Sequence, residues 1–338
     1  MHLAQMRIDF KAFACEHPVS STVSRRACDD FGRALPLQRL QLDWVGVRAV
    51  AFYAVLPTRI ERTVSMHNPV EGIGEAYDRI ADLYDVQWSR HVSRPQARLT
   101  DGLALAPGLR CADLGCGTGV DTLEMARLAA PGEVVAIDCS QAMLDAAVRR
   151  AAAAGLSLTT SCQGAEEFIE SAALSSFDVI TLRFVLGYFD WRKVLSHLPR
   201  LLRADGRIGI LTILAGSAPQ AYGTYKQMVG DLGLPDVGLT ALDTIDQVED
   251  GLTRAGAEIT EAWVEEFRLS FGSGAELAGW LRTSGIATAK ELVGVPNDLL
   301  DLLWNNFGTR VEAYREGAIV PLDFRIAGVV ARVSGRPA

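Results

Sequence analysis

The sequence predicts an α/β protein built on a parallel sheet with helices on both faces. Three observations support this fold class. Short apolar runs alternate with amphipathic or alanine-rich segments from residue 110 to residue 214. A glycine-rich turn follows the first of these runs, and an acidic residue ends the second. Parallel strands that are buried on both faces appear as nearly continuous apolar runs, and their alternation with helices produces a doubly wound sheet.

The segment Arg110–Asp138 is the clearest part of this pattern: it reads as strand, glycine turn, helix and strand. Its glycine turn carries three glycines at alternate positions, Gly115, Gly117 and Gly119. Glycine lets the backbone pass close to a ligand, and the start of the following helix presents free N–H groups there. Asp138, at the end of the second strand, is placed to accept hydrogen bonds from a ribose diol. The segment therefore predicts a nucleotide-like ligand.

The remaining elements follow in chain order. Helices are expected over Glu75–Trp88, Ser140–Ala154, Trp191–Leu202, 244–256, 273–285 and Asp298–Tyr314. Strands are expected over Leu156–Cys162, Phe177–Leu182, Arg207–Leu214, Ile259–Phe271 and Phe324–Val333. The first of these helices is amphipathic, and its Tyr-Asp pair recurs after seven residues, so that Tyr77 and Tyr84 share a face. Gly216–Leu239 is expected to be rich in loops.

Composition and net charge exclude some classes of function for this protein. The chain has 338 residues and a net charge of −8, which argues against nucleic acid as a partner. Its six cysteines form no C-x-x-C pair, so we expect reduced, buried thiols in a cytoplasmic protein and no metal site. No secretory signal or membrane-spanning run is visible, so no membrane association is expected. The sequence leaves a monomer and a homodimer as alternatives. Residues 1–65 lack a clear period, and we expect a poorly structured extension or an over-long start, with Met66 as an alternative first residue.

The glycine spacing distinguishes two classes of cofactor. A dinucleotide fingerprint would need a third glycine at position 120 or 122, where the chain has Val120 and Thr122. The sequence instead contains Asp-x-Gly-x-Gly-x-Gly from Asp113 to Gly119. It resembles motif I of the class I S-adenosylmethionine (SAM) dependent methyltransferases, with Asp138 at their acidic second-strand position. An NAD(P)-dependent oxidoreductase is kept as an alternative, and so is a SAM-binding sensor or partner subunit without activity.

A second segment carries the resemblance further. Tyr-Asp-x-x-Ala-x-x-Tyr-Asp, from Tyr77 to Asp85, resembles the N-terminal segment of the ubiquinone/menaquinone methylases and their relatives. The resemblance covers roughly residues 70–335. It implies a Rossmann-like sheet of seven strands in the order 3-2-1-4-5-7-6, with strand 7 antiparallel. It also implies a methyltransferase domain over 66–338, whose core is 74–215, 240–271 and 322–335, and whose substrate cap is 216–239 and 272–320.

The resemblance implies SAM as the cofactor, bound around the glycine turn. The residues expected to bind it are Tyr77, Asp113, Gly115, Cys116, Gly117, Gly119, Asp138, Cys139, Met143, Glu166 and Arg183. Asp113 would lie near the methionine end of the cofactor. Arg183 would reach the methionine carboxylate or form a salt bridge, and Met143 would contact adenine or pack in the core. Relatives commonly have Gly-Asp-Ala-Glu near strand three. Here Gly164 takes the place of the aspartate, or the loop is one residue shorter, and Glu166 is expected to substitute together with backbone carbonyls.

Methyl transfer from a sulfonium is an in-line displacement that needs close alignment and exclusion of water, and a base only where the acceptor must lose a proton. The candidate catalytic residues are His91, Arg183 and Tyr84. The candidate substrate pocket consists of Tyr84, Tyr188, Tyr222, Tyr225 and Trp280. The end of strand four lacks the motifs of nucleic-acid methylases, so the expected partner is a small organic acceptor. Quinone-like, polyketide-like or other natural-product scaffolds suit the aromatic segments, with transfer to oxygen, carbon or nitrogen.

Overall fold

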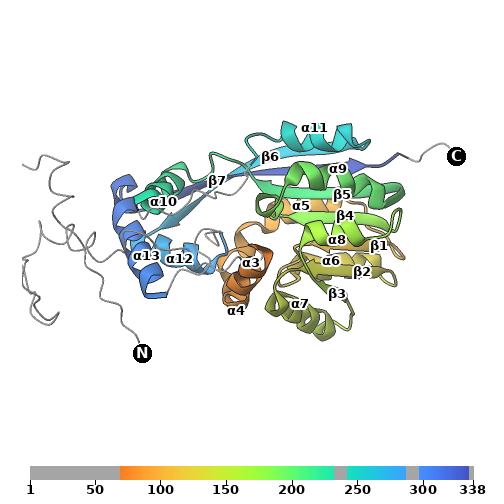
Figure 1. Ribbon diagram of the computed structural model, residues 1–338, viewed down its shortest axis with the longest axis horizontal. Helices are drawn as coiled ribbons and strands as arrows, with labels where there is room; N and C mark the ends of the chain where they lie inside the picture. The colour runs from red at the N-terminus through yellow and green to blue at the C-terminus, as the bar shows by residue number, and fades with distance from the viewer. Residues whose placement is uncertain (1–68, 232–241, 287–296, 335–338) are drawn as a thin grey trace, which may run out of the picture. The chain divides into compact units, whose positions relative to one another are not determined.

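The structure is a computed structural model that describes residues 69–231, 242–286 and 297–334. The extension expected over residues 1–65 lies outside the described residues. The described elements form one seven-stranded sheet in the order β3-β2-β1-β4-β5-β7-β6 (Figure 1). Its strands are β1 Arg110–Leu114, β2 Glu133–Asp138, β3 Thr159–Cys162, β4 Phe177–Arg183, β5 Leu202–Ile213, β6 Glu258–Phe271 and β7 Val320–Arg332. Strands β1 to β5 pair in parallel, and β7 is antiparallel to both β5 and β6. The predicted strand order is confirmed.

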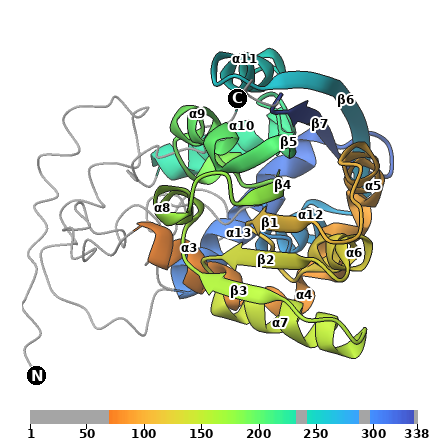
Figure 2. The same cartoon turned by 90° about the vertical axis from the view of Figure 1, so that its right-hand side faces the viewer.

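Alternate residues of the central strands enter two separate apolar cores. Cys111, Val134 and Val179 pack with α5 (Ser93–Gly102) and α6 (Val120–Ala129). Their chain neighbours belong to the second core, with α8 (Ala165–Ser171), α9 (Trp191–Leu201) and α11 (Asp246–Arg254). Figure 2 shows α5 and α6 on one side of the sheet, and α9 and α11 on the other. Both faces are therefore covered, as the continuous apolar runs indicate.

The helix expected over Glu75–Trp88 is in fact two helices, α3 (Pro69–Asp78) and α4 (Ala81–Gln87). The break falls at Ile80, which is buried beside Ala81 against Met143 of α7 (Gln141–Ala153). The Asp78 carboxylate, at the end of α3, accepts hydrogen bonds from the start of α7. These tertiary contacts decide where the helix breaks, and the amphipathic period, which continues through the break, does not reveal it.

The segment expected to be rich in loops, Gly216–Leu239, contains a helix, α10 (Pro219–Asp231). Tyr222, Tyr225 and Met228 recur every three residues, which is helical spacing, and Pro219 occupies a first helical position, where proline is favoured. Gly223 and Gly230 obscured this pattern. The other helices of this region are α12 (Gly274–Thr283) and α13 (Asn297–Val311). Figure 1 shows α10, α12 and α13 gathered near the same end of β6 and β7.

Several boundaries differ from the expectations. Strand β7 begins at Val320, four residues earlier than the predicted start at Phe324, and its added residues pair with the far end of β6. Strand β5 already begins at Leu202, and the expected turn at 204–206 is a bulge inside it, where Asp205 has φ +62°. Helices α5 and α8 were not predicted, because α8 has only seven residues and α5 contains a single large apolar residue, Leu99, so that neither shows a clear helical period.

Candidate active site

The three glycines of the turn after β1 have different surroundings. All three have positive φ, so an L side chain would be strained at each of them. A Cβ at Gly115 would lie 2.2 Å from the Val185 side chain, and one at Gly119 would lie 2.5 Å from the Cβ of Ala147. At Gly117 the nearest atom is a ring carbon of Tyr84, 3.8 Å away. Gly115 and Gly119 therefore permit close packing, whereas Gly117 keeps space open beneath Tyr84.

Asp138, at the end of β2, is bound to this turn. Its carboxylate accepts hydrogen bonds from the backbone N–H of Gly117 and from that of Ser140, each at 2.9 Å. Burial raises the pKa of Asp138 to about 6, although these backbone donors act in the opposite direction. Each carboxylate oxygen has two lone pairs. The group therefore retains capacity to accept further hydrogen bonds at the mouth of the turn.

Asp113 and Arg183 lie together beneath the turn. The Arg183 guanidinium donates to Asp113 at 3.0 Å, and the side chains of Thr122 and Thr181 each donate to the same carboxylate at 2.6 Å. Asp113 and Arg183 are 2% and 6% exposed. The pair joins the ends of β1 and β4 to the start of α6. The ion pair considered for Arg183 is present, and direct contact of either side chain with a cofactor stays a prediction.

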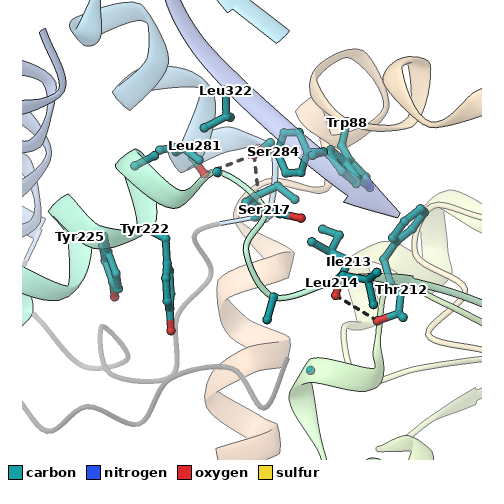
Figure 3. A pocket seen from close by; sticks show the side chains of 18 of the residues that line it. Trp88, Thr212, Ile213, Leu214, Ser217, Tyr222, Tyr225, Leu281, Ser284 and Leu322 are labelled. Atoms are coloured by element: carbon teal, nitrogen blue, oxygen red, sulfur yellow. Dashed lines mark hydrogen bonds between the residues drawn. The ribbon is translucent and has the colours of Figure 1, made fainter. Parts of the chain in front are cut away.

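A cavity of about 380 Å³ has Tyr84, the residue nearest to the Cβ position of Gly117, in its wall. Its walls come from α3, α4, the segments after β4 and β5, α10, the end of α12, α13 and β7. Figure 3 shows Tyr222 and Tyr225 extending from α10, with Thr212 and Ile213 at the end of β5 and Leu214 just after it. The described residues that line the cavity include no charged side chain. Its lining is mainly apolar and aromatic, which is typical of sites for small organic molecules.

Three tyrosines stand between the cavity and the glycine turn. The hydroxyls of Tyr77 and Tyr188 are 2.7 Å apart and share a hydrogen bond, and the ring of Tyr77 packs edge-on against that of Tyr84 at 6.1 Å. Burial raises the pKa of all three phenols, that of Tyr188 to about 12, and the nearby Asp138 carboxylate adds to the effect. These groups therefore stay protonated at neutral pH, where they can donate hydrogen bonds but cannot act as bases.

The structure brings Tyr84, Tyr188, Tyr222 and Tyr225 of the expected substrate pocket to the cavity. Trp280 lies outside its lining: the indole N–H donates to the Gln87 carbonyl at 2.8 Å, and the ring packs on Trp88. His91 also lies outside the lining, with its ring against Trp280 and with a hydrogen bond from Arg90. Burial and the Arg90 charge lower the pKa of His91. Trp280 and His91 are therefore not assembled with the tyrosines.

The other expected cofactor residues lie around Asp138. Met143 is buried with Ile80 and Ala81, in the core arrangement considered for it. Cys139 is half-buried, and burial raises the pKa of its thiol to about 12; that of Cys116 is raised as well. Both thiols therefore stay protonated at neutral pH. Glu166 lies in the first turn of α8, which follows the loop after β3. Their contact with a cofactor stays a prediction.

Sequence reasoning missed several cavity residues. Trp88, Phe184, Trp304 and Phe307 all line the cavity. Phe184 has φ +60°, an uncommon conformation for a bulky residue that is often found at functional sites. Its ring packs edge-on against Trp88 at 5.4 Å. The one available signal was the position of Phe184 immediately after β4, because ligands bind beyond the carboxyl ends of parallel strands.

Among the described residues, no group of three or more His, Cys, Asp or Glu side chains could hold a metal ion. None of the helices in the described ranges has the length and apolar character needed to cross a bilayer.

Comparison with known proteins agrees with this geometry. The family described as "Methyltransferase domain" matches residues 111–206. Nocamycin O-methyltransferase from Saccharothrix syringae is 30% identical over 242 residues, which cover 64% of this chain and 83% of that protein. 27-O-demethylrifamycin SV methyltransferase from Amycolatopsis mediterranei is 28% identical, over 55% of this chain and 73% of that protein.

A solved structure supports the fold alone. The YcgJ protein from Bacillus subtilis aligns with a TM-score of 0.52 and 16% identity, over 72% of this chain and all of that one. The sequence relatives overturn both alternatives kept open above, the NAD(P)-dependent oxidoreductase and the binding subunit without activity. The glycine turn, the acidic end of β2, the strand order and the relatives lead to one assignment. The chain belongs to the class I SAM-dependent methyltransferases, and it is an enzyme.

Proposed function

We propose that this enzyme transfers the methyl group of SAM to a hydroxyl of an uncharged, largely apolar acceptor of the polyketide type. The single observation that carries the proposal is the aromatic cavity of about 380 Å³, one wall of which is Tyr84, the neighbour of Gly117. Both relatives described above have names that specify methylation of oxygen, in nocamycin and in a rifamycin. Their acceptors support the class of compound proposed here and do not identify the acceptor of this chain.

The residues around the glycine turn fit SAM. The space at Gly117 would be closed by a larger side chain, and the Asp138 carboxylate has lone pairs available for the ribose hydroxyls. We propose that Asp138 binds the ribose and that the N–H groups at the start of α6 lie near the methionine end. When bound, SAM would supply a methyl group activated by the sulfonium charge.

The cavity supports an acceptor without charge. A carboxylate, phosphate or ammonium group inside it would lose hydration without gaining an opposite charge from the described lining. The polar side-chain groups of the described lining include the hydroxyls of the tyrosines and those of Thr212, Ser217 and Ser284. Such groups can orient a neutral acceptor through a few hydrogen bonds, while the aromatic walls exclude water from the reacting atoms.

The described lining also constrains the chemistry. Its tyrosines have raised pKa values, and His91 lies outside it, so we propose that no side chain of the lining removes the acceptor proton. The acceptor hydroxyl would therefore be acidic by itself, as an enol or a phenol is. It would bind in its neutral form and lose its proton to solvent as its oxygen forms the bond to the methyl group and the sulfonium becomes a neutral thioether. Tyr84 would position the acceptor by donating a hydrogen bond. An acceptor that is an acidic hydroxyl would be methylated at oxygen and not at nitrogen or carbon.

The first experiment is a calorimetric titration with S-adenosylhomocysteine (SAH), the product form of the cofactor, on the natural protein and on Asp138→Ala. Micromolar binding that weakens at least tenfold in Asp138→Ala is expected. Transfer of a labelled methyl group from SAM should then be measured on a panel of enols and phenols, with acidic and cationic analogues as controls. If neither protein binds SAH, the proposal is wrong. Faster transfer to charged acceptors than to neutral ones would contradict the acceptor class.

Outside the cofactor site, we propose that residues 216–239 and 272–320 form a substrate cap on a core of 74–215, 240–271 and 322–335. Described residues of both cap segments, in α10, α12 and α13, line the cavity opposite the strand ends.

A further inference from the structure

The two Tyr-Asp pairs of α3 and α4 each face two sites at once. Tyr77 and Tyr84 line the cavity, and the aspartate that follows each of them binds the segments that flank Asp138. Consecutive residues of a helix point about 100° apart, so each pair can reach two surfaces. The seven-residue repeat in the sequence therefore places two similar contacts, one at the end of α3 and one within α4.

Asp78 binds the start of α7. Its carboxylate accepts a hydrogen bond from the Ser140 hydroxyl at 2.6 Å and another from the Ala142 N–H at 3.0 Å. The same Ser140 hydroxyl caps α7 by accepting from the Met143 N–H, and the Ser140 N–H donates to Asp138. A continuous chain of hydrogen bonds therefore runs from Asp78 through Ser140 to the proposed ribose-binding carboxylate.

Asp85 binds the glycine turn itself. Its carboxylate accepts a hydrogen bond from the Thr118 hydroxyl at 2.5 Å and forms an ion pair with Arg150. The Arg150 side chain also donates to the Thr118 carbonyl at 3.1 Å, so that Asp85 and Arg150 together hold the hydroxyl and the carbonyl of this residue. Thr118 lies between Gly117 and Gly119 and is 3% exposed. The conformation of the turn is thereby linked to the position of α4.

We propose that Asp78 and Asp85 are positioning residues that fix Tyr77 and Tyr84 relative to the glycine turn and so couple acceptor binding to cofactor binding. Tyr84, which lies next to Asp85, has its ring 3.8 Å from the Cβ position of Gly117. Because Tyr84 and Asp85 are adjacent in α4, the contact of Asp85 with the glycine turn also determines where the Tyr84 ring lies in the cavity wall. The inference rests on the proposed function, since it assumes that SAM binds at the turn.

The test compares Asp85→Ala with Asp82→Ala, a matched control because Asp82 is an exposed acid on the same helix. Each protein is titrated with SAH by calorimetry, and its near-ultraviolet circular dichroism is recorded free and at saturating SAH. We expect the dissociation constant to rise about tenfold in Asp85→Ala and to change less than twofold in Asp82→Ala. The tyrosine signal induced by saturating SAH should be lost in Asp85→Ala alone.

A second variant separates this coupling from loss of the fold. Asp85→Asn keeps an acceptor for the Thr118 hydroxyl and removes the charge that faces Arg150, so an intermediate dissociation constant is expected. With an acceptor identified among the enols and phenols of the panel, Asp85→Ala should also raise the KM for that acceptor by a larger factor than it lowers kcat. Equal SAH binding and equal dichroic change in Asp85→Ala and Asp82→Ala would overturn the positioning role. Failure of the natural protein to bind SAH would overturn the proposed function, and the inference with it.

Discussion

Asp138 combines two properties that oppose each other. It is held by backbone N–H donors, which favour the carboxylate, and it is buried, which favours the neutral acid; burial dominates and raises its pKa from 3.8 to about 6. Only the carboxylate can accept hydrogen bonds from both ribose hydroxyls, because the neutral acid has a proton on one oxygen. Cofactor affinity is therefore expected to fall as the pH drops through about 6.

The pH dependence has a definite sign. Between pH 8 and pH 7 Asp138 is ionised and SAH affinity should be constant, whereas below pH 6 affinity should fall by up to tenfold per pH unit as the free protein takes up a proton. Calorimetry from pH 8 to pH 5 checks this, with proton release on binding near pH 6 as a second readout. Asp138→Asn, which cannot ionise, is the control and should bind weakly at all these values. A wild-type affinity that is flat down to pH 5 would contradict the assignment.

At the scale of single elements, the end of α12 shows how a helix terminus shapes the site. Gly285 has φ +81°, and its carbonyl accepts a hydrogen bond from the Tyr77 hydroxyl at 3.3 Å. A Cβ there would lie 2.8 Å from the ring of Tyr77 and 3.0 Å from that of Tyr84. Gly285, which directly follows the C-cap of α12, therefore leaves room for both tyrosine rings because it has no side chain.

Replacing two glycines of this region by alanine, one at a time, should change the free energy of unfolding in opposite directions. Gly285→Ala should lower the free energy of unfolding by about 1–3 kcal/mol, because it combines a strained φ with contact against two rings. Gly279→Ala, inside α12 and with no atom within 4 Å of its Cβ position, should raise it by about 0.5–1 kcal/mol. Urea unfolding measures both. Equal effects of the two changes would show that packing against Tyr77 and Tyr84 is unimportant.

At the scale of the whole molecule, the site is assembled from segments far apart in the chain. The cavity takes residues from Tyr77 to Phe324, and the sheet positions them through the long antiparallel pairing of β6 with β7. All seven strands of the described sheet lie between Arg110 and Arg332. Fold and site can therefore be tested together by shortening the chain.

A chain that begins at Met66 is expected to unfold cooperatively, with a thermal midpoint within a few degrees of that of the full chain, and to bind SAH with unchanged affinity. The physical reason is that both apolar cores and every described cavity residue lie after this position. Calorimetry measures both quantities. Loss of the cooperative transition would contradict the view that residues 1–65 are dispensable.

The sequence alone was informative where the signal is local. The strand–turn–helix–strand unit Arg110–Asp138 was predicted because each part has its own period and the glycines mark the turn. The strand order followed from resemblance to a family, since single-strand patterns do not specify neighbours. The cofactor class followed from the spacing of three glycines, with Val120 and Thr122 excluding the dinucleotide fingerprint. These features depend on residues close together in the chain.

The tertiary structure decided what depends on residues far apart. The break between α3 and α4 follows from contacts with α7, and the pairing of Asp113 with Arg183 joins residues 70 positions apart. The exclusion of His91 and Trp280 from the cavity, and the inclusion of Trp304 and Phe307, depend on how α12 and α13 pack. Local periodicity determined the elements and the cofactor turn. Long-range packing, which no local pattern encodes, decided which side chains meet around the acceptor.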